Sequence, residues 1–181
     1  AARRGAIILS GHLGNWEVGA MLVRRLGCPV TVVVLPHLDP QTDRLFNRQR
    51  ERCGVRVVPL GRDAAHESLR QLREGQLLGL TGDRVFAGRG IQTPLFGRSV
   101  ILPIGPALLS LRSHAPVVPT FCIREAPWKF RLSFESPIWP TGGRVRDGAV
   151  RAVTTAYATA LERYVRRFPS QWLLFQPMAS S

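Results

Sequence analysis

Residues 6–35, AIILSGHLGNWEVGAMLVRRLGCPVTVVVL, contain two short apolar runs separated by a polar loop and a helix-like segment. The runs at residues 6–10 and 30–35 are rich in aliphatic side chains and too short for ordinary helices, which favours buried strands. Between them, residues 15–26 carry apolar side chains at the spacing of one helix face: Trp16, Ala20, Val23 and Leu26. A strand, a helix and a second buried strand are typical of parallel α/β sheets.

The rest of the chain continues this alternation. Apolar runs predict further strands at residues 55–60, 76–81, 92–96, 117–123 and 130–134, and helical patterns occupy residues 39–53, 64–73, 105–113 and 147–168. Glycine and proline punctuate residues 84–104, where we expect loops on either side of the strand at 92–96. The predicted fold is a single α/β domain over residues 1–181, with a mixed, mostly parallel sheet flanked by helices.

Composition restricts the setting of this domain. No stretch approaches the ~18 to 20 apolar residues of a membrane span, and the chain begins almost directly on a strand without an initiator Met. We therefore expect a fragment that lacks an N-terminal portion. Cys28, Cys53 and Cys122 form no CxxC pair, which predicts reduced, packed thiols and no disulfide.

The net charge is strongly positive. Lys and Arg number 25 against 12 Asp and Glu, for a formal charge of +13, and the charge is spread along the chain. Such a balance attracts anionic partners, and nucleic acid, anionic lipid headgroups and an acidic carrier protein all fit it. No helix-turn-helix, zinc-finger or RNP-like pattern is present, so we expect no nucleic-acid partner. An anion-binding module without catalytic activity remains an alternative.

The loop SGHLGNWE holds the strongest candidate for chemistry. His12 follows the first strand at the sheet edge where ligands bind in open α/β folds, and Gly11 and Gly14 bracket it. Asn15 is placed to cap the next helix, with Glu17 in its first turn. If Glu17 accepts a hydrogen bond from one ring nitrogen of His12, the other nitrogen can act as a base. The alternative is a loop histidine beside an unrelated helix start.

Several common active-site motifs are missing: G-x-S-x-G, the Walker A loop, HExxH and G-x-G-x-x-G. Four separate blocks instead resemble the bacterial late acyltransferases of lipid A biosynthesis, a family that includes the phosphatidylinositol mannoside acyltransferases. The blocks are GHLGNWE, TGDR at residues 81–84, PLFGRSVILPIGPALLSLRSHAPVVPTF, and PSQW at residues 169–172. Members usually carry a hydrophobic N-terminal anchor, which is not present here.

The resemblance implies an O-acyltransferase with a glycerolipid-acyltransferase-like fold at the cytoplasmic face of the inner membrane. It would move a fatty acyl chain from acyl carrier protein or acyl-CoA to a hydroxyl of a glycolipid, without cofactor, metal or covalent intermediate. The family motif assigns the general base to His12 and its orienting partner to Glu17. A glycerol-phosphate or lysophospholipid acyltransferase is the alternative, and the TGDR and PSQW blocks argue against it.

Acyl transfer also needs stabilisation of an oxyanion. The expected donors are the backbone amides of Gly14 and Asn15 and the guanidinium of Arg84, although a surface pair between Arg84 and Asp83 is an equal alternative. Asp83 and Arg89 complete the expected substrate-binding group, Arg89 through a phosphate or headgroup. The PLF and ILPI segments, residues 94–96 and 101–104, could line an acyl groove, meet the membrane or pack in the core. We expect Trp172 to pack on the sheet.

Overall fold

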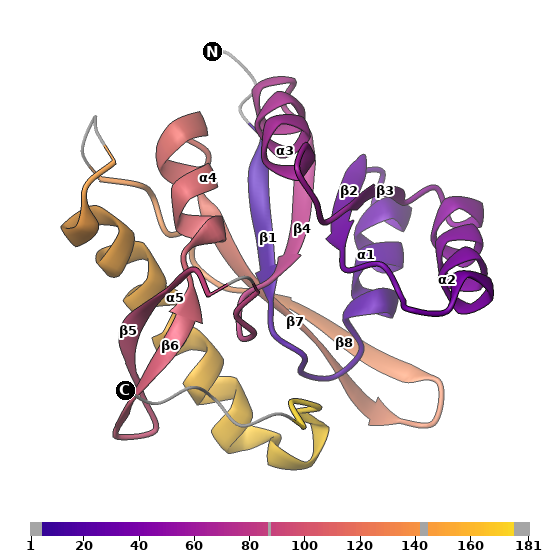
Figure 1. Ribbon diagram of the computed structural model, residues 1–181. Coiled ribbons are helices and arrows are strands. Elements are labelled where there is room, and N and C mark those ends of the chain that lie inside the picture. Colours follow the sequence, from indigo (N-terminus) through magenta and orange to yellow (C-terminus); the bar gives the residue numbers. More distant parts are fainter. Residues whose placement is uncertain (1–4, 87, 142–144, 176–181) are drawn as a thin grey trace.

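The computed structural model describes residues 5–86, 88–141 and 145–175. Its centre is a six-stranded sheet in the order β3-β2-β4-β1-β7-β8 (Figure 1). The strands are β1 (Ala6–Ser10), β2 (Val30–Val34), β3 (Arg56–Pro59), β4 (Leu77–Thr81), β7 (Val117–Ala126) and β8 (Lys129–Phe134). The first five strands of this order run parallel and β8 is antiparallel to β7. The predicted mixed, mostly parallel sheet is therefore confirmed.

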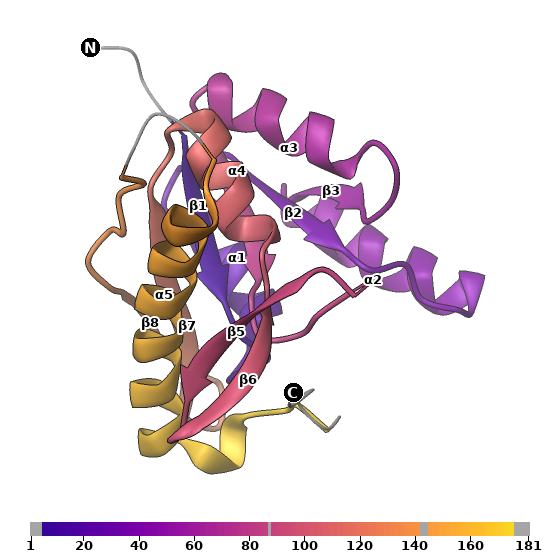
Figure 2. The ribbon, with the colours of Figure 1, turned by 60° about the vertical axis from the view of Figure 1, so that its left-hand side comes forward.

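Helices cover both faces of this sheet. The helices are α1 (Trp16–Arg25), α2 (Pro40–Arg52), α3 (Ala64–Arg73), α4 (Gly105–Ser113) and α5 (Asp147–Arg167). Helix α4 contacts both α3 and α5, so these three form one layer, while α1 packs against β2 and β7 from the other side (Figure 2). Helix α2 contacts β3 and projects beyond the sheet. The result is the α/β layering expected from the sequence.

The helix boundaries follow the residues that predicted them. The Asn15 side chain accepts a hydrogen bond from the Val18 amide at the start of α1, and the Asp39 side chain caps α2 in the same way. Gly54 and Gly75 follow the ends of α2 and α3 with left-handed φ angles of 73° and 78°. Asn15 therefore caps α1 as expected, and Asp39, Gly54 and Gly75 have the capping roles usual for Asp and Gly.

One segment differs from the sequence prediction. The residues expected to form a loop at 97–104 mostly form β6 (Arg98–Pro103), which pairs antiparallel with β5 (Gly90–Leu95) in a separate hairpin. Leu95 and Leu102 are almost fully buried in a cluster that includes Ala158 of α5. These parts of the PLF and ILPI segments therefore pack in the core. Their strand character was hidden because the prolines lie on a two-stranded hairpin, where a missing amide donor is tolerated.

The register between β1 and β4 positions the functional site. Ser10 pairs with Thr81, and the Gly82 amide donates to the Ser10 carbonyl at 2.8 Å. Two residues beyond the last pair, His12 and Asp83 leave the same carboxyl edge of the sheet. The neighbouring strand β7 lies on the other side of β1, so this edge is where strand connections diverge and ligands bind in open α/β sheets.

Two sequence expectations concern membranes and thiols. Among the described residues, no helix combines the length and apolar character needed to cross a membrane. All three cysteines are free, but only Cys122 is buried, whereas Cys28 and Cys53 are exposed. The expectation of packed thiols is therefore wrong for two of the three, because both lie at the exposed ends of helical connections.

Candidate active site

His12 and Asp83 form a close pair at the sheet edge. His12 Nδ1 lies 2.7 Å from Asp83 Oδ1, and the His12 amide donates to Asp83 Oδ2 at 2.7 Å. The Asp83 side chain is fully buried, while the His12 side chain retains 19% exposure. An ionised carboxylate can only accept, so Nδ1 carries the proton and Nε2 presents its lone pair.

The Asp83 carboxylate is held by a third donor. The indole Nε1 of Trp172 donates to Asp83 Oδ2 at 3.0 Å. Oδ2 therefore accepts from two N–H groups while Oδ1 faces the imidazole. Trp172 packs against the main hydrophobic core, as expected. The indole bond to Asp83 was not expected, and it forms because the chain after α5 turns back to the loop that holds His12.

Close packing behind this pair fixes the two loops. A Cβ added to Gly11 would lie 2.9 Å from Asp83 Oδ2, and one added to Gly82 would lie 2.8 Å from the Tyr157 ring. The Tyr157 hydroxyl donates to the Ser10 carbonyl at 2.8 Å. Burial, and then the nearby charge of Asp83, raise the pKa of Tyr157 well above its ordinary value, so this hydroxyl stays protonated.

Contrary to the expectation, no hydrogen bond or ion pair joins Glu17 to His12 among the described residues. The two carboxylate oxygens of Glu17 accept hydrogen bonds from Nε and Nη2 of Arg50, with the Nε bond at 2.8 Å. The Arg50 side chain is only 7% exposed. Capping by Asn15 starts the helix before Glu17, so Glu17 lies on the side of α1 that faces α2. Among the described residues the carboxylate that contacts the His12 ring is that of Asp83, and Glu17 instead links α1 to α2.

The two backbone amides expected to stabilise an oxyanion already have acceptors. The Gly14 amide donates to the Gln171 carbonyl at 2.9 Å, and the Asn15 amide donates to the Cys122 carbonyl at 2.8 Å. A backbone N–H has a single proton to donate, so neither group is available to a substrate in this arrangement. The expected oxyanion role of Gly14 and Asn15 is therefore corrected to a structural one.

The arginines of the expected substrate group lie close in sequence to Asp83. In the described part of the chain, Arg84 forms no ion pair with Asp83, because the Asp83 oxygens accept from His12 and Trp172. The Arg84 guanidinium instead lies 5.1 Å from the centroid of the Phe86 ring. Arg89 is exposed. Trp16 packs its ring edge-on against the His12 imidazole, with centroids 4.9 Å apart, and so forms a wall of the site.

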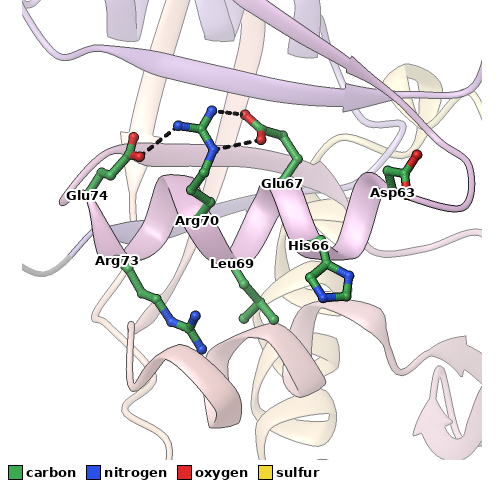
Figure 3. Close-up of a pocket in the computed structure, with 7 residues that line it drawn as sticks. All are labelled: Asp63, His66, Glu67, Leu69, Arg70, Arg73 and Glu74. Atoms are coloured by element: carbon green, nitrogen blue, oxygen red, sulfur yellow. Dashed lines mark hydrogen bonds and ion pairs between the residues drawn. The ribbon is translucent and has the colours of Figure 1, made fainter.

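A second feature is a solvent-open hollow of about 670 Å³ along α3 (Figure 3). On one side of α3, Arg70 donates to Glu67 at 2.8 Å and to Glu74 at 2.7 Å. His66 and Leu69 point away from these ion pairs. None of the lining residues takes part in the His12 network, and Arg70 is already paired with Glu67 and Glu74. We therefore assign the candidate active site to the His12–Asp83 pair at the carboxyl edge of the sheet.

The arrangement can abstract a proton from a hydroxyl. In such a reaction the base would be the Nε2 atom of His12, and the buried carboxylate of Asp83 would stabilise the imidazolium. The sequence singled out His12 but not the carboxylate that contacts its ring. The available signal was that His12 and Asp83 each come two residues after a buried strand, yet only the strand order shows that those strands are neighbours.

Comparisons with known proteins show the family to which the chain is similar. The family model described as bacterial lipid A biosynthesis acyltransferase matches residues 1–178. Phosphatidylinositol mannoside acyltransferases of Mycobacterium tuberculosis, strains CDC 1551 / Oshkosh and H37Rv, are each 31% identical over 98% of this chain and 55% of their own length. That of Mycolicibacterium smegmatis is 31% identical over 97% of this chain and 57% of its own. The chain thus spans about half the length of these curated relatives.

Proposed function

The chain belongs to the bacterial lipid A biosynthesis acyltransferase family, and from this premise we propose that it transfers a fatty acyl chain from a thioester donor to a hydroxyl of a glycolipid. The observation that carries the proposal is the buried Asp83 carboxylate on Nδ1 of His12, with Nε2 left as the base. A histidine in this state suits a hydroxyl acceptor, which must lose its proton as it attacks.

The proposed reaction is a direct transfer. Nε2 of His12 removes the proton of the acceptor hydroxyl while the hydroxyl oxygen bonds to the thioester carbonyl carbon. The tetrahedral oxyanion then collapses, the carbon–sulfur bond breaks, and the imidazolium returns its proton to the leaving thiolate. Asp83 keeps the imidazole in the required tautomer and lowers the energy of the imidazolium, without itself becoming protonated.

The oxyanion needs donors that are not already engaged. With the amides of Gly14 and Asn15 taken by other carbonyls, the guanidinium of Arg84 is our candidate, since it follows Asp83 directly and no described carboxylate neutralises it. Arg89, which is exposed nearby in the sequence, is our candidate for a phosphate of the donor or the acceptor.

The acceptor we favour is a mannosylated phosphatidylinositol. The support is the similarity to phosphatidylinositol mannoside acyltransferases over nearly the whole chain. A lipid A precursor is the second candidate acceptor, from the description of the family. Acyl-CoA and acyl carrier protein are both proposed donors, and the formal charge of +13 would favour either anionic donor.

Membrane attachment on the cytoplasmic face is part of the proposal. The apolar surface that supports it lies at the β2–α2 connection and in α2, where Leu38 is fully exposed and Leu45 is 58% exposed. Arg44 and Arg48 are exposed on the same helix. Leucines beside arginines suit a bilayer that contains anionic lipids. Exchanging Leu38 and Leu45 for Asp should abolish co-sedimentation with such vesicles, and unchanged binding would exclude this surface.

Acyl transfer is tested with the purified full-length protein and an acyl thioester. Acceptors are a phosphatidylinositol mannoside, a lipid A precursor and lysophosphatidic acid, each analysed by mass spectrometry. We expect transfer to the mannoside, and its loss in His12→Ala with the fold retained by circular dichroism. His66→Ala, on the exposed face of α3, is the matched control and should keep full activity. Transfer only to lysophosphatidic acid would replace the proposal with the glycerolipid alternative, and full activity of His12→Ala would remove the base.

A further inference from the structure

The chain that follows α5 returns to the loop that holds His12. After a short 3-10 helix at Pro169–Gln171, residue Trp172 forms an antiparallel bridge with Leu13. The Leu173 amide donates to the His12 carbonyl at 2.7 Å, and the Gln171 carbonyl accepts from the Gly14 amide. We call residues 169–173 the strap, because its backbone holds the active-site loop on both sides of Leu13.

The strap is also fixed to the sheet. The Gln171 side chain accepts from the Arg124 amide at 3.0 Å and donates to the Arg124 carbonyl at 2.9 Å, as a neighbouring strand would. The strap therefore has a defined position relative to β7 as well as to the loop. A side chain carried by it can be placed with the accuracy that catalysis requires.

Trp172 is that side chain. Its indole N–H ends on Asp83 Oδ2 at 3.0 Å, and its ring lies 5.6 Å from the Phe96 ring. Packing against Phe96 explains the position of the Trp172 ring. It does not explain why Nε1, the only polar atom of the side chain, faces a fully buried carboxylate. Because water does not reach the Asp83 side chain, no water molecule could replace the indole hydrogen bond if it were removed. The Asp83 carboxylate would then be freer to rotate about its bond to Cβ.

We propose that Trp172 is a positioning residue: its indole N–H fixes the plane of the Asp83 carboxylate so that Oδ1 stays aligned on Nδ1 of His12. This rests on the proposed acyl transfer for its effect on rate, but the alignment itself is a property of the fold. Trp172 touches neither substrate in this scheme. It acts through Asp83, and Asp83 acts through His12.

The activity test uses Trp172→Phe, which keeps an aromatic ring and removes the N–H. We expect kcat to fall about 10- to 100-fold, as for a hydrogen bond to a charged group, with KM for donor and acceptor unchanged. The control is Trp128→Phe at a position that is 95% exposed. In an Asp83→Asn background, Trp172→Phe should cost less than about twofold, because the two residues act in series. The proposal would be overturned if the losses in kcat of Asp83→Asn and Trp172→Phe multiplied in the double variant, or if Trp172→Phe alone kept the wild-type kcat.

A second measurement needs no transfer activity. In the ¹⁵N-labelled wild-type protein, the indole proton of Trp172 should exchange slowly with solvent and its resonance should move in Asp83→Asn. The ¹⁵N shifts of His12 should report the Nδ1–H tautomer, and a mixture of tautomers in Trp172→Phe. A rapidly exchanging indole, or unchanged His12 shifts in Trp172→Phe, would refute the alignment. Failure of the wild-type protein to transfer acyl groups would count against the proposed function alone.

Discussion

Replacing Asp83 with Asn is the sharpest perturbation of the candidate site. In the structure, the Asp83 oxygen that accepts from the His12 amide and the Trp172 indole must remain an acceptor. The carboxamide of Asp83→Asn therefore directs its oxygen to those two donors and its NH₂ group to Nδ1 of His12. Nδ1 must then be the acceptor, so the proton moves to Nε2 and the base is lost.

The magnitude follows from that change of tautomer. A carboxylate-to-amide change beside a catalytic histidine lowers kcat by roughly 10⁴-fold in a serine protease. Because the Asp83 side chain is fully buried and water cannot substitute for it, we expect a loss of about 10³- to 10⁴-fold, or about 4–5.5 kcal/mol in the activation free energy. KM should change little, because Asp83 contacts no substrate in the proposed scheme.

Glu17→Gln is the matched comparison, since the family motif assigned the partner of His12 to Glu17. Losing this carboxylate leaves the 7%-exposed Arg50 side chain without its ion pair. We therefore expect the free energy of unfolding to fall by about 1–3 kcal/mol, with a lower melting temperature. The kcat per folded molecule should stay within about tenfold of wild type.

The assay is the initial rate of thiol release from an acyl thioester in the presence of acceptor, with product measured by mass spectrometry and folding measured by circular dichroism. If Asp83→Asn keeps more than about one-tenth of kcat, the proposed pair is wrong. If Glu17→Gln instead loses as much as Asp83→Asn at an unchanged melting temperature, the orienting role belongs to Glu17 in solution.

Three further predictions use other contacts. Gly11→Ala should lower kcat at least about tenfold, because its Cβ would press on the held carboxylate, whereas Gly61→Ala, with open space around it, should be silent in the same rate assay. Burial raises the pKa of Cys122 to about 11, so its thiol stays protonated at lower pH, and peptide mapping should find it alkylated only after unfolding. Tyr157→Phe should lower the free energy of unfolding, measured by urea denaturation, by about 1 kcal/mol, because the hydrogen bond to the Ser10 carbonyl is lost. An unchanged urea midpoint would show that this hydrogen bond does not stabilise the fold.

The sequence predicted the local elements well because their signals are local. The run of residues 64–73 and the glycine after its end defined α3 to the residue, and Asn15 marked the start of α1. The hairpin strand β6 was missed because prolines in its surroundings resemble those of a loop.

The site was predicted only in part for a related reason. His12 was predicted from its position after a strand, and Glu17 was predicted as its partner because it is near in sequence and belongs to the same family motif. The capped helix turns Glu17 toward Arg50, which lies 33 residues further along. The true neighbour, Asp83, is 71 residues away from His12, and Trp172 is 89 residues beyond Asp83. Contacts of that range depend on strand order and on where α5 ends, which residue patterns do not encode.

The register of β1 and β4 also has an engineering consequence. The His12 and Asp83 side chains meet because two adjacent strands end together, so the connection between β2 and β3 can be exchanged without moving them, provided β2 stays paired with β4 and β3 stays at the edge of the sheet. Transplanting residues 35–54, which include the exposed Leu38 and Leu45, from a homologue that keeps Arg50 as the partner of Glu17 should thus yield a chimaera with a new lipid preference and an intact turnover step.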